Sequence, residues 1–385
     1  MRILIALPGL HRYDRGAEFA FIAVAKELAK VGDKVTLIGS GNAHQQAMPY
    51  RFLRAASVRR ENFESYPSLP GLRNEYCYEE LTFVPQLLYR YRPDEYDITV
   101  TCSYPFTNWA LRRPVLGGRR PRHVFVTHNG DWPAYARQSG ARQSEFRFFD
   151  CDGLICINPD FHERNVRRWN SRLIPNGVDC DRFRPGLAQR EQFGLPQDKM
   201  IVLMVSALIP NKRIEFGIDA VSRITDAHLV VAGDGPLRKT IAAEAARRLP
   251  GRFTLLSVAP ERMPSLYQAA DVFLQCSKDE PFPLVFLEAM ACGLPIVGHD
   301  IPRVRWFVGD DEFLANMDDP AAIAESIQRA RSLGSAGRDK RLNRAASFSW
   351  TKIAGMYRDF FQDIITGSDT ETGFAKTDTQ RARSI

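Results

Sequence analysis

Two glutamates, Glu280 and Glu288, stand eight positions apart around a segment that begins Pro-Phe-Pro and continues into an apolar pattern. We expect a helix over residues 284–292, because Gly293 and Pro295 supply a C-cap glycine and a following proline. Free N–H groups at a helix start attract phosphate oxygens, and carboxylates accept hydrogen bonds from hydroxyls. The pattern therefore indicates a site in which Glu280 binds a sugar and Glu288 a ribose. The spacing alone is equally typical of an amphipathic surface helix.

Further motifs accompany this pair in a fixed order along the chain. They are IPNGVDCDRFRP at 174–185, VAGDGP at 231–236, LYQAADVFL at 266–274 and FSW at 348–350. Together with the pair, which resembles an E-x7-E motif, they resemble glycosyltransferase family 4, whose members are retaining enzymes of the GT-B fold that use nucleotide sugars. The match covers most of residues 174 to 360.

The resemblance implies where the diphosphate of the nucleotide sugar is held. The family places an arginine and a lysine on this group, just after a strand of the second half. Lys212 matches the lysine, but Ala207 stands where the arginine is usual. Arg213 is the nearest replacement, although as the next residue it can point elsewhere. Arginine and lysine are not equivalent on phosphate, because only arginine offers a planar bidentate fork.

Backbone amides at the helix start are the other expected diphosphate ligands. The resemblance assigns them to the segment Phe282, Pro283, Leu284 and Val285, in which the proline has no N–H to donate. Glu280 is expected to hold sugar hydroxyls and not to act as a nucleophile. Retaining hydrolases use two carboxylates about 5 Å apart, and no matching second carboxylate is identified here. Retaining GT-B enzymes are instead thought to react on one face of the sugar, with the leaving phosphate taking the acceptor's proton.

The first half carries two looser matches to the family. The loop from Asp14 to Glu18 resembles its Gly-Gly-x-Glu loop, with Arg15 in place of the first glycine. Gly16 is predicted to let the backbone approach the phosphates. His128 follows a predicted strand and matches a histidine that faces the transferred sugar. Glu280, Lys212 and His128 are thus the candidate catalytic residues. Contacts to the base are expected around Val258.

Neither a metal nor a cofactor is predicted. Two D-x-D triplets, at residues 150–152 and 179–181, are interpreted as structural because one precedes a buried strand and the other lies in the segment that joins the domains. No G-x-G-x-x-G follows the first strand of either half, which argues against a dehydrogenase. The seven cysteines are scattered and odd in number, as is typical of reduced thiols in a cytoplasmic protein.

The charge of the chain is uneven. Residues 1–185 hold 27 Lys and Arg against 20 Asp and Glu, and the rest holds 25 of each. The basic half favours a lipid-linked or phosphorylated acceptor and peripheral contact with an anionic inner membrane face, although a solvated basic surface explains it equally well. No nucleic-acid-binding motif accompanies the arginines. No apolar run approaches the roughly 20 residues of a membrane span, and Met1-Arg2 leads straight into a strand, without the features of a signal peptide.

The alternation of short apolar segments and helical patterns predicts βαβ units with parallel sheets in both halves. With the resemblance, the fold class is α/β of the GT-B type: two Rossmann-like, doubly wound domains facing across a cleft. The expected divisions are an acceptor-side domain over 1–185, a nucleotide-sugar domain over 186–348, a crossover helix over 349–366 and a disordered tail over 367–385. The predicted strands are 2–7, 34–38, 97–101, 123–127, 153–157, 200–205, 228–232, 253–256, 272–275 and 295–298.

We therefore predict a retaining, metal-independent glycosyltransferase that moves a hexose-type sugar from a UDP- or GDP-sugar to a hydroxyl. Such an enzyme would serve polysaccharide, glycolipid or glycoconjugate synthesis. Two alternatives stay open. One is another GT-B enzyme, such as a nucleotide-sugar epimerase or a phosphorylase. The other is a non-catalytic nucleotide-sugar-binding or scaffold protein, which the missing arginine at Ala207 favours.

Overall fold

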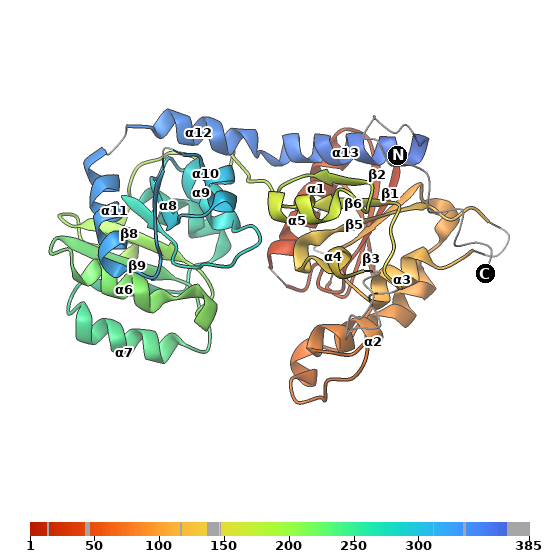
Figure 1. Ribbon diagram of the computed structural model, residues 1–385, viewed down its shortest axis with the longest axis horizontal. Coiled ribbons are helices and arrows are strands. Elements are labelled where there is room, and N and C mark those ends of the chain that lie inside the picture. The colour runs from red at the N-terminus through yellow and green to blue at the C-terminus, as the bar shows by residue number, and fades with distance from the viewer. Residues whose placement is uncertain are drawn as a thin grey trace. The chain divides into compact units, whose positions relative to one another are not determined.

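The computed structural model describes residues 1–13, 15–42, 47–115, 118–136, 146, 148–310, 312–333 and 336–367. Asp14 of the predicted phosphate loop and residues 368–385 of the predicted tail lie outside these ranges. The chain divides into two compact units (Figure 1). The first unit comprises Met1–Pro175 and the chain from Ile353 onward, and the second comprises Asn176–Lys352.

Within the described part of the first unit, seven parallel strands form one sheet. The central strand β1 reads Ile-Leu-Ile-Ala after its first residue and is buried over these four positions, as expected for a strand covered on both faces. The edge strand β3 is short and bears an arginine at each end, which disfavours pairing with another chain. In spatial order the strands are β3 (Arg51–Arg54), β2 (Lys34–Gly39), β1 (Arg2–Ala6), β4 (Ile98–Thr101), β5 (Arg122–Val126), β6 (Gly153–Cys156) and β7 (Ser171–Leu173).

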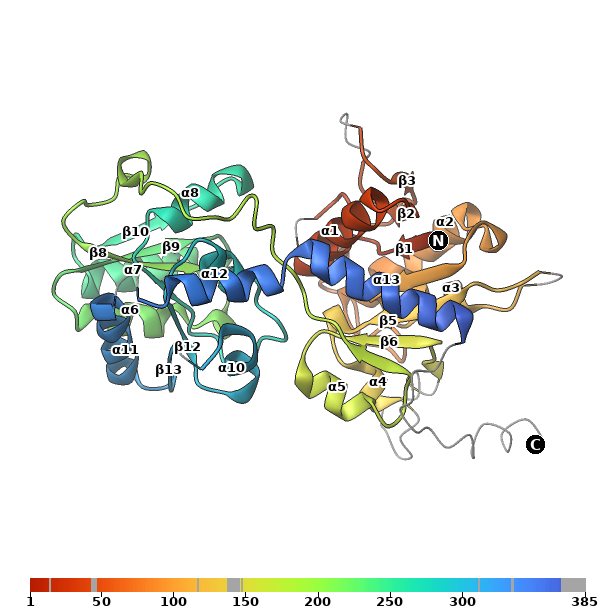
Figure 2. The ribbon, with the colours of Figure 1, turned by 90° about the horizontal axis from the view of Figure 1, so that it is seen from above.

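Helices connect these strands, and the last helix of the chain also belongs to this unit from Ile353 onward. Its Arg358 Nε lies 3.0 Å from Asp33, and its Asp363 accepts a 2.8 Å hydrogen bond from Arg172. Figure 2 shows this helix, α13, beside α1 on the first unit, which confirms the predicted return of the C-terminal helix. The helices of this unit are α1 (Gly16–Lys30), α2 (Glu75–Arg90), α3 (Phe106–Arg112), α4 (Trp132–Tyr135), α5 (Pro159–Asn165) and, from Ile353, α13 (Trp350–Thr366).

The described residues of the second unit form a sheet of six parallel strands around their own apolar core. Its strands, in spatial order, are β10 (Phe253–Leu256), β9 (Ala227–Ala232), β8 (Met200–Val205), β11 (Val272–Leu274), β12 (Ile296–His299) and β13 (Phe313–Ala315). Its helices are α6 (Ile214–Ser222), α7 (Arg238–Arg248), α8 (Met263–Gln268), α9 (Leu284–Ala291), α10 (Pro302–Val308), α11 (Pro320–Leu333) and α12 (Arg338–Ser347).

The two parallel sheets predicted from the alternating pattern are confirmed, and every predicted strand is present to within one residue at each end. Three strands of four residues or fewer, β3, β7 and β13, were not predicted. Each is an edge strand, and an edge strand has one neighbour and needs little continuous apolar sequence.

Candidate functional site

The Glu280 segment lies at the carboxyl edge of the second sheet. Strands β8 and β11 are parallel neighbours, with Val272 opposite Val202. The loops that follow them carry Lys212 and Glu280, respectively. Because parallel strands end at the same edge, this pairing brings together two residues that are 68 positions apart. Open α/β sheets bind their ligands beyond this edge.

Lys212 and Glu280 form a direct ion pair. The lysine Nζ lies 2.5 Å from Oε1 of the glutamate, and the two side chains are 18% and 17% exposed. Gln275, the first residue after β11, donates its Nε2 to the same carboxylate oxygen at 2.9 Å. Sequence reasoning placed Gln275 inside the strand and missed its role. Its position directly after a buried strand was the available signal.

The loop after β8 is shaped by the glycine turn after β9. A Cβ at Gly233 would lie 1.9 Å from the carbonyl oxygen of Ser206, and one at Gly235 would lie 2.7 Å from that of Leu208. At both glycines the backbone therefore lies closer to the loop than a residue with a side chain could. Ala207 lies exposed between these two contacts. A longer side chain at this position has room on the solvent side.

Arg213 is engaged away from Lys212. Its backbone is left-handed, with φ 55°. Its Nη2 donates to Asp318 Oδ1 at 2.7 Å and to the Met317 carbonyl at 3.0 Å. Its guanidinium also lies 3.8 Å from the ring centroid of Phe216. These contacts hold it beside residues 317–318, so its assignment to the diphosphate stays a prediction.

Helix α9 starts directly after this site. Its N-cap residue, Pro283, makes no side-chain capping hydrogen bond. The amides of its first turn, including those of Leu284 and Val285, therefore receive no acceptor from a cap and suit a phosphate. The side chain of Phe282 is buried and packs against Phe307, with centroids 5.4 Å apart. This residue thus contributes backbone only.

Glu288 lies about one turn after the start of α9 and accepts a 2.7 Å hydrogen bond from the hydroxyl of Tyr267 on α8. Burial raises the pKa of Glu288, and the tyrosine bond opposes that shift. Tyr267 belongs to the segment 266–274 singled out in the sequence, but no role was assigned to it. Val258, the predicted base contact, is half-buried in the loop after β10.

His128 and Gly16 lie in the first unit, on the wall of a cavity of about 500 Å³. Burial lowers the pKa of His128 to about 3, so its imidazole is neutral at physiological pH. Its Nε2 is shielded from solvent and has no hydrogen-bond partner among the described residues. Gly16 is exposed at the start of α1, and a Cβ there would meet nothing within 4 Å. Protein packing therefore does not require this glycine.

Three buried glutamates also line this cavity. Glu18 ends the loop that the sequence matched to the family, whereas sequence reasoning did not identify Glu79 and Glu80. Glu18 is 4% exposed, Glu79 2% and Glu80 4%. Burial raises the pKa of all three, that of Glu80 to about 7. The amide of Thr107 donates to Glu80 at 3.3 Å. The Glu79-Glu80 doublet, on a helix that is otherwise largely apolar on one face, was the available signal.

The D-x-D triplets hold local structure. Asp152 accepts hydrogen bonds from Arg120 at 3.1 Å and from the amide of His123 at 2.7 Å. Asp179 accepts from the amide of Arg182 at 3.0 Å. In the part of the chain that the structure describes, no group of three His, Cys, Asp or Glu side chains is placed to hold a metal.

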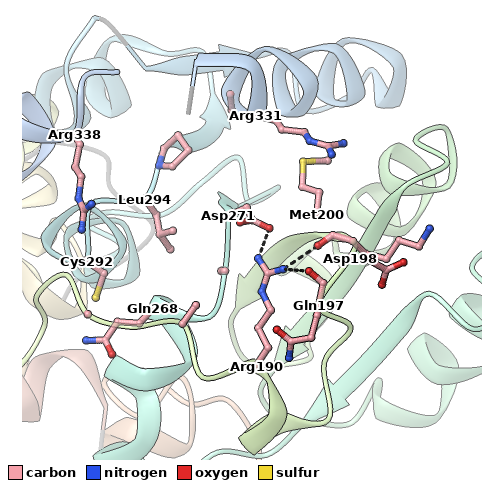
Figure 3. A pocket seen from close by; sticks show the side chains of 17 residues that line it. Arg190, Gln197, Asp198, Met200, Gln268, Asp271, Cys292, Leu294, Arg331 and Arg338 are labelled. Atoms are coloured by element: carbon pink, nitrogen blue, oxygen red, sulfur yellow. Dashed lines mark hydrogen bonds and ion pairs between the residues drawn. The ribbon is translucent and has the colours of Figure 1, made fainter. Parts of the chain in front are cut away.

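A second cavity, of about 560 Å³, lies in the other unit. Met200, Asp271 and Pro295 line it at the amino ends of β8, β11 and β12, opposite the edge that carries Glu280. Figure 3 shows Arg190 inside it, bonded to Asp271 at 2.7 Å and to the carbonyls of residues 197 and 199 at 3.1 Å. These bonds tie the joining segment to the sheet, so we assign this cavity a structural role.

Two family models match the chain. One is described as "Glycosyl transferases group 1" and covers residues 187–347. The other is described as "Glycosyltransferase Family 4" and covers residues 15–182. Together they span both compact units.

Curated relatives match over different shares of the chain. Alpha-monoglucosyldiacylglycerol synthase of Streptococcus pneumoniae is 26% identical over 301 residues, 71% of this chain and 66% of that protein. D-inositol 3-phosphate glycosyltransferase of Acidothermus cellulolyticus is 30% identical over 213 residues, 49% of this chain and 48% of that protein. The chain therefore spans between about half and two thirds of these two relatives. The lipopolysaccharide core glycosyltransferase LpsE of Rhizobium meliloti is 24% identical over 82% of this chain and 85% of its own length.

Solved structures share the fold. Sucrose-phosphate synthase of Thermosynechococcus elongatus superposes with a TM-score of 0.73 at 24% identity, covering 95% of this chain and 100% of that one. Anabaena HepE in complex with UDP and glucose gives 0.70 at 19% identity, covering 94% and 99%. These likenesses confirm the predicted fold class. Among the described residues, no helix is both long enough and apolar enough to cross a bilayer.

Proposed function

The chain belongs to glycosyltransferase family 4, and we propose that it transfers a sugar from a UDP- or GDP-sugar to an acceptor hydroxyl in glycolipid, polysaccharide or glycoconjugate synthesis. It is a retaining, nucleotide-sugar-dependent enzyme of a family that typically needs no metal. The observation that carries the proposal is the Lys212–Glu280 ion pair, set beside the uncapped start of α9.

Each part of the nucleotide sugar has a proposed partner on the second unit. Lys212 and the amides of the first turn of α9 stabilise the diphosphate as it leaves, since charge stabilisation is usually the largest catalytic contribution. Glu280 accepts hydrogen bonds from sugar hydroxyls, and Glu288 from the ribose. Val258 lies against the base. On the first unit, neutral His128 is proposed to face the sugar and Gly16 to admit the phosphates.

The ion pair has a consequence for donor binding. Lys212 and Glu280 satisfy each other in the structure. A diphosphate competes with the carboxylate for the ammonium group, because both are anions. Binding is therefore expected to turn Lys212 toward phosphate and to free Glu280 Oε1 for a sugar hydroxyl. The departing phosphate then takes the proton of the acceptor hydroxyl as the new bond forms on the same face of the sugar.

The relatives favour particular substrates. The HepE structures hold UDP, glucose or UDP-glucose, which favours a UDP-sugar here. The Streptococcus relative is named for a diacylglycerol glycolipid, which favours a lipid-linked acceptor and peripheral contact with an anionic membrane. We further propose a cytoplasmic location, which is supported by the seven cysteines, all in the described residues, because they form no disulfide.

The competing proposal is a nucleotide-sugar-binding protein without turnover. It rests on Ala207, which leaves the diphosphate one arginine short. Both proposals predict nucleotide binding, but only one predicts product.

The test has two stages. Thermal unfolding with UDP, GDP and ADP, each with and without EDTA, identifies the base. A ligand at about 100 times its Kd stabilises the folded state by roughly 2.7 kcal/mol. The matching sugar conjugates are then incubated with a panel of hydroxyl acceptors, and the anomeric configuration of the product is read by NMR. An inverted product, or binding without turnover over the whole panel, would refute the proposed enzyme.

A further inference from the structure

One wall of the first-unit cavity is strongly basic. The guanidinium groups of Arg12, Arg15 and Arg60 gather around the ring of Tyr13, at 5.5, 3.9 and 5.3 Å from its centroid. Arg60 also stacks on Tyr76 at 3.9 Å. Three cations thus share one aromatic neighbourhood. Two of them, Arg15 and Arg60, line the cavity itself.

Carboxylates of the protein pair with only some of the guanidinium N–H groups of this wall. Glu79 accepts two hydrogen bonds from Arg60, at 2.8 and 3.1 Å, and lies 3.8 Å from Arg12. Arg15 lies 3.9 Å from Glu61, which is beyond hydrogen-bond distance. The Nη1 atoms of Arg15 and Arg60 are both shielded from solvent and have no acceptor among the described residues. A shielded donor on a charged group without a partner is unfavourable, so the wall suits an added anion.

The rest of the cavity suits a polyhydroxylated group. Tyr104 and Trp132 line it with rings whose centroids lie 6.2 Å apart. Glu18 and Glu80 line it as well, and burial raises the pKa of both carboxyls. Because burial raises the pKa of Glu80 to about 7, this carboxyl carries only part of its negative charge near neutral pH. A volume of about 500 Å³ lies within the roughly 300–1,000 Å³ of small-molecule sites and admits a head group but not acyl chains.

We propose that this cavity binds the acceptor, and that the acceptor carries a phosphate ester held by Arg15 and Arg60. The proposal rests on the glycosyltransferase function proposed above. Two guanidinium groups offer the bidentate geometry that phosphate oxygens prefer. Glu79 keeps Arg60 against the cavity by its two hydrogen bonds. The phosphate belongs either to a soluble sugar phosphate or to the head group of a phospholipid, and the chemistry of recognition is the same.

The test compares matched probes on the full chain saturated with UDP. Isothermal titration uses myo-inositol 1-phosphate against myo-inositol, and glucose 6-phosphate against glucose. Sedimentation uses vesicles of phosphatidylcholine with and without phosphatidylinositol. We expect at least tenfold tighter binding of one phosphorylated probe than of its unphosphorylated partner. If only the vesicles bind, the source is a lipid head group, and if the soluble esters bind, it is a sugar phosphate.

Variants then locate the binding. Arg60→Ala and Arg15→Gly should each weaken binding of the phosphorylated probe at least tenfold, and Arg60→Ala, which lies outside the predicted donor residues, should leave UDP affinity unchanged. Arg51→Ala removes the same charge from β3, where the side chain is 62% exposed and lies 3.6 Å from Glu95. This control should change the affinity for neither the phosphorylated probe nor UDP.

We expect Arg15→Gly to fold normally, because this side chain is 35% exposed and makes no hydrogen bond to Glu61. A loss of binding in this variant can therefore be attributed to the missing guanidinium group. Equal binding of phosphorylated and unphosphorylated probes would overturn the proposal, as would equal losses in Arg15→Gly and Arg51→Ala. A protein that fails to bind any nucleotide refutes the proposed function instead, so the two failures are distinct.

Discussion

Glu280→Gln separates the charge of the Glu280 carboxylate from its shape. The amide oxygen of glutamine can still accept from Lys212 and Gln275, which now converge on one carboxylate oxygen. Only the negative charge is lost. If Glu280 competes with the diphosphate for Lys212, the variant should bind UDP more tightly and yet transfer sugar far more slowly. Most substitutions of a binding residue weaken both.

The magnitudes follow from the partial burial of the pair. The side chains are 18% and 17% exposed, so turning a charge-assisted hydrogen bond into a neutral one should cost about 1 kcal/mol of unfolding free energy. That cost lowers the melting temperature of a unit of this size by roughly 2–4 °C. A freed lysine should strengthen UDP binding about three- to tenfold, or about 0.7–1.4 kcal/mol. Loss of a ligand that acts on the reacting sugar should lower kcat by about 10²–10³.

Isothermal titration with UDP and single-turnover transfer with an acceptor found in the panel measure both effects. Glu325→Gln is the matched control, because Glu325 is exposed on α11 of the same unit and its charge lies outside the site. Tenfold weaker UDP binding in Glu280→Gln would show that the carboxylate does not compete with phosphate. Turnover within threefold of the wild type would remove Glu280 from the reaction.

Four further outcomes are expected. Ala207→Arg should tighten UDP binding about tenfold or more in titration calorimetry, since a charge-assisted hydrogen bond contributes about 1.5–3 kcal/mol; no gain would mean that the diphosphate lies elsewhere. Tyr267→Phe removes the 2.7 Å bond to Glu288 and should lower the free energy of unfolding in urea by about 1 kcal/mol. A larger loss of affinity for UDP than for uracil would indicate that ribose binding is affected. Gly16→Ala should leave the melting temperature unchanged or raised, because its Cβ meets open space, but should weaken UDP binding if phosphates approach this backbone. Glu80 keeps its proton in the folded state up to about pH 7 and loses it near pH 4.5 when unfolded. As the pH rises from about 4.5 to 7, the free energy of unfolding of the wild type should therefore fall by about 3 kcal/mol more than that of Glu80→Gln. Parallel plots of unfolding free energy against pH for the two proteins would refute the raised pKa of Glu80.

The second unit was largely predictable because its sequence signals are local. Apolar runs of four to six residues gave β8, β9 and β10, and Gly293 ended α9 as expected. The Lys212–Glu280 contact was not predicted as such. It depends on β8 and β11 being neighbours in the sheet, and a chain pattern without pairing information does not specify strand order. Gln275 was missed for the same reason, since only the end of β11 turns it toward the glutamate.

The first unit was less predictable, since its cavity is built from residues that are distant in sequence. Glu18 follows β1, while Glu79 and Arg60 come from the region between β3 and β4, where the sequence is rich in Tyr, Phe and Pro and weakly periodic. A charged doublet on a helix is usually solvated. Here Glu79 is 2% exposed because Arg60 and Arg12 accompany it into the interior, and that pairing is visible only in three dimensions.

The charges around the proposed diphosphate site bear on the expected effect of Ala207. Glu280 neutralises Lys212, and Asp318 engages Arg213. This edge of the second sheet therefore offers little net positive charge, and it has no arginine at position 207 to add more. Attraction for a diphosphate must then come mainly from the first-turn amides of α9 and from the exchange of Lys212 between carboxylate and phosphate. An anion that binds by displacing an internal carboxylate gains less than one that meets a free cation, because the displaced contact offsets the new one. In the proposed mechanism the same exchange would release the Glu280 carboxylate only when the diphosphate is present, so the proposed sugar-binding group would become available together with the substrate that carries the sugar.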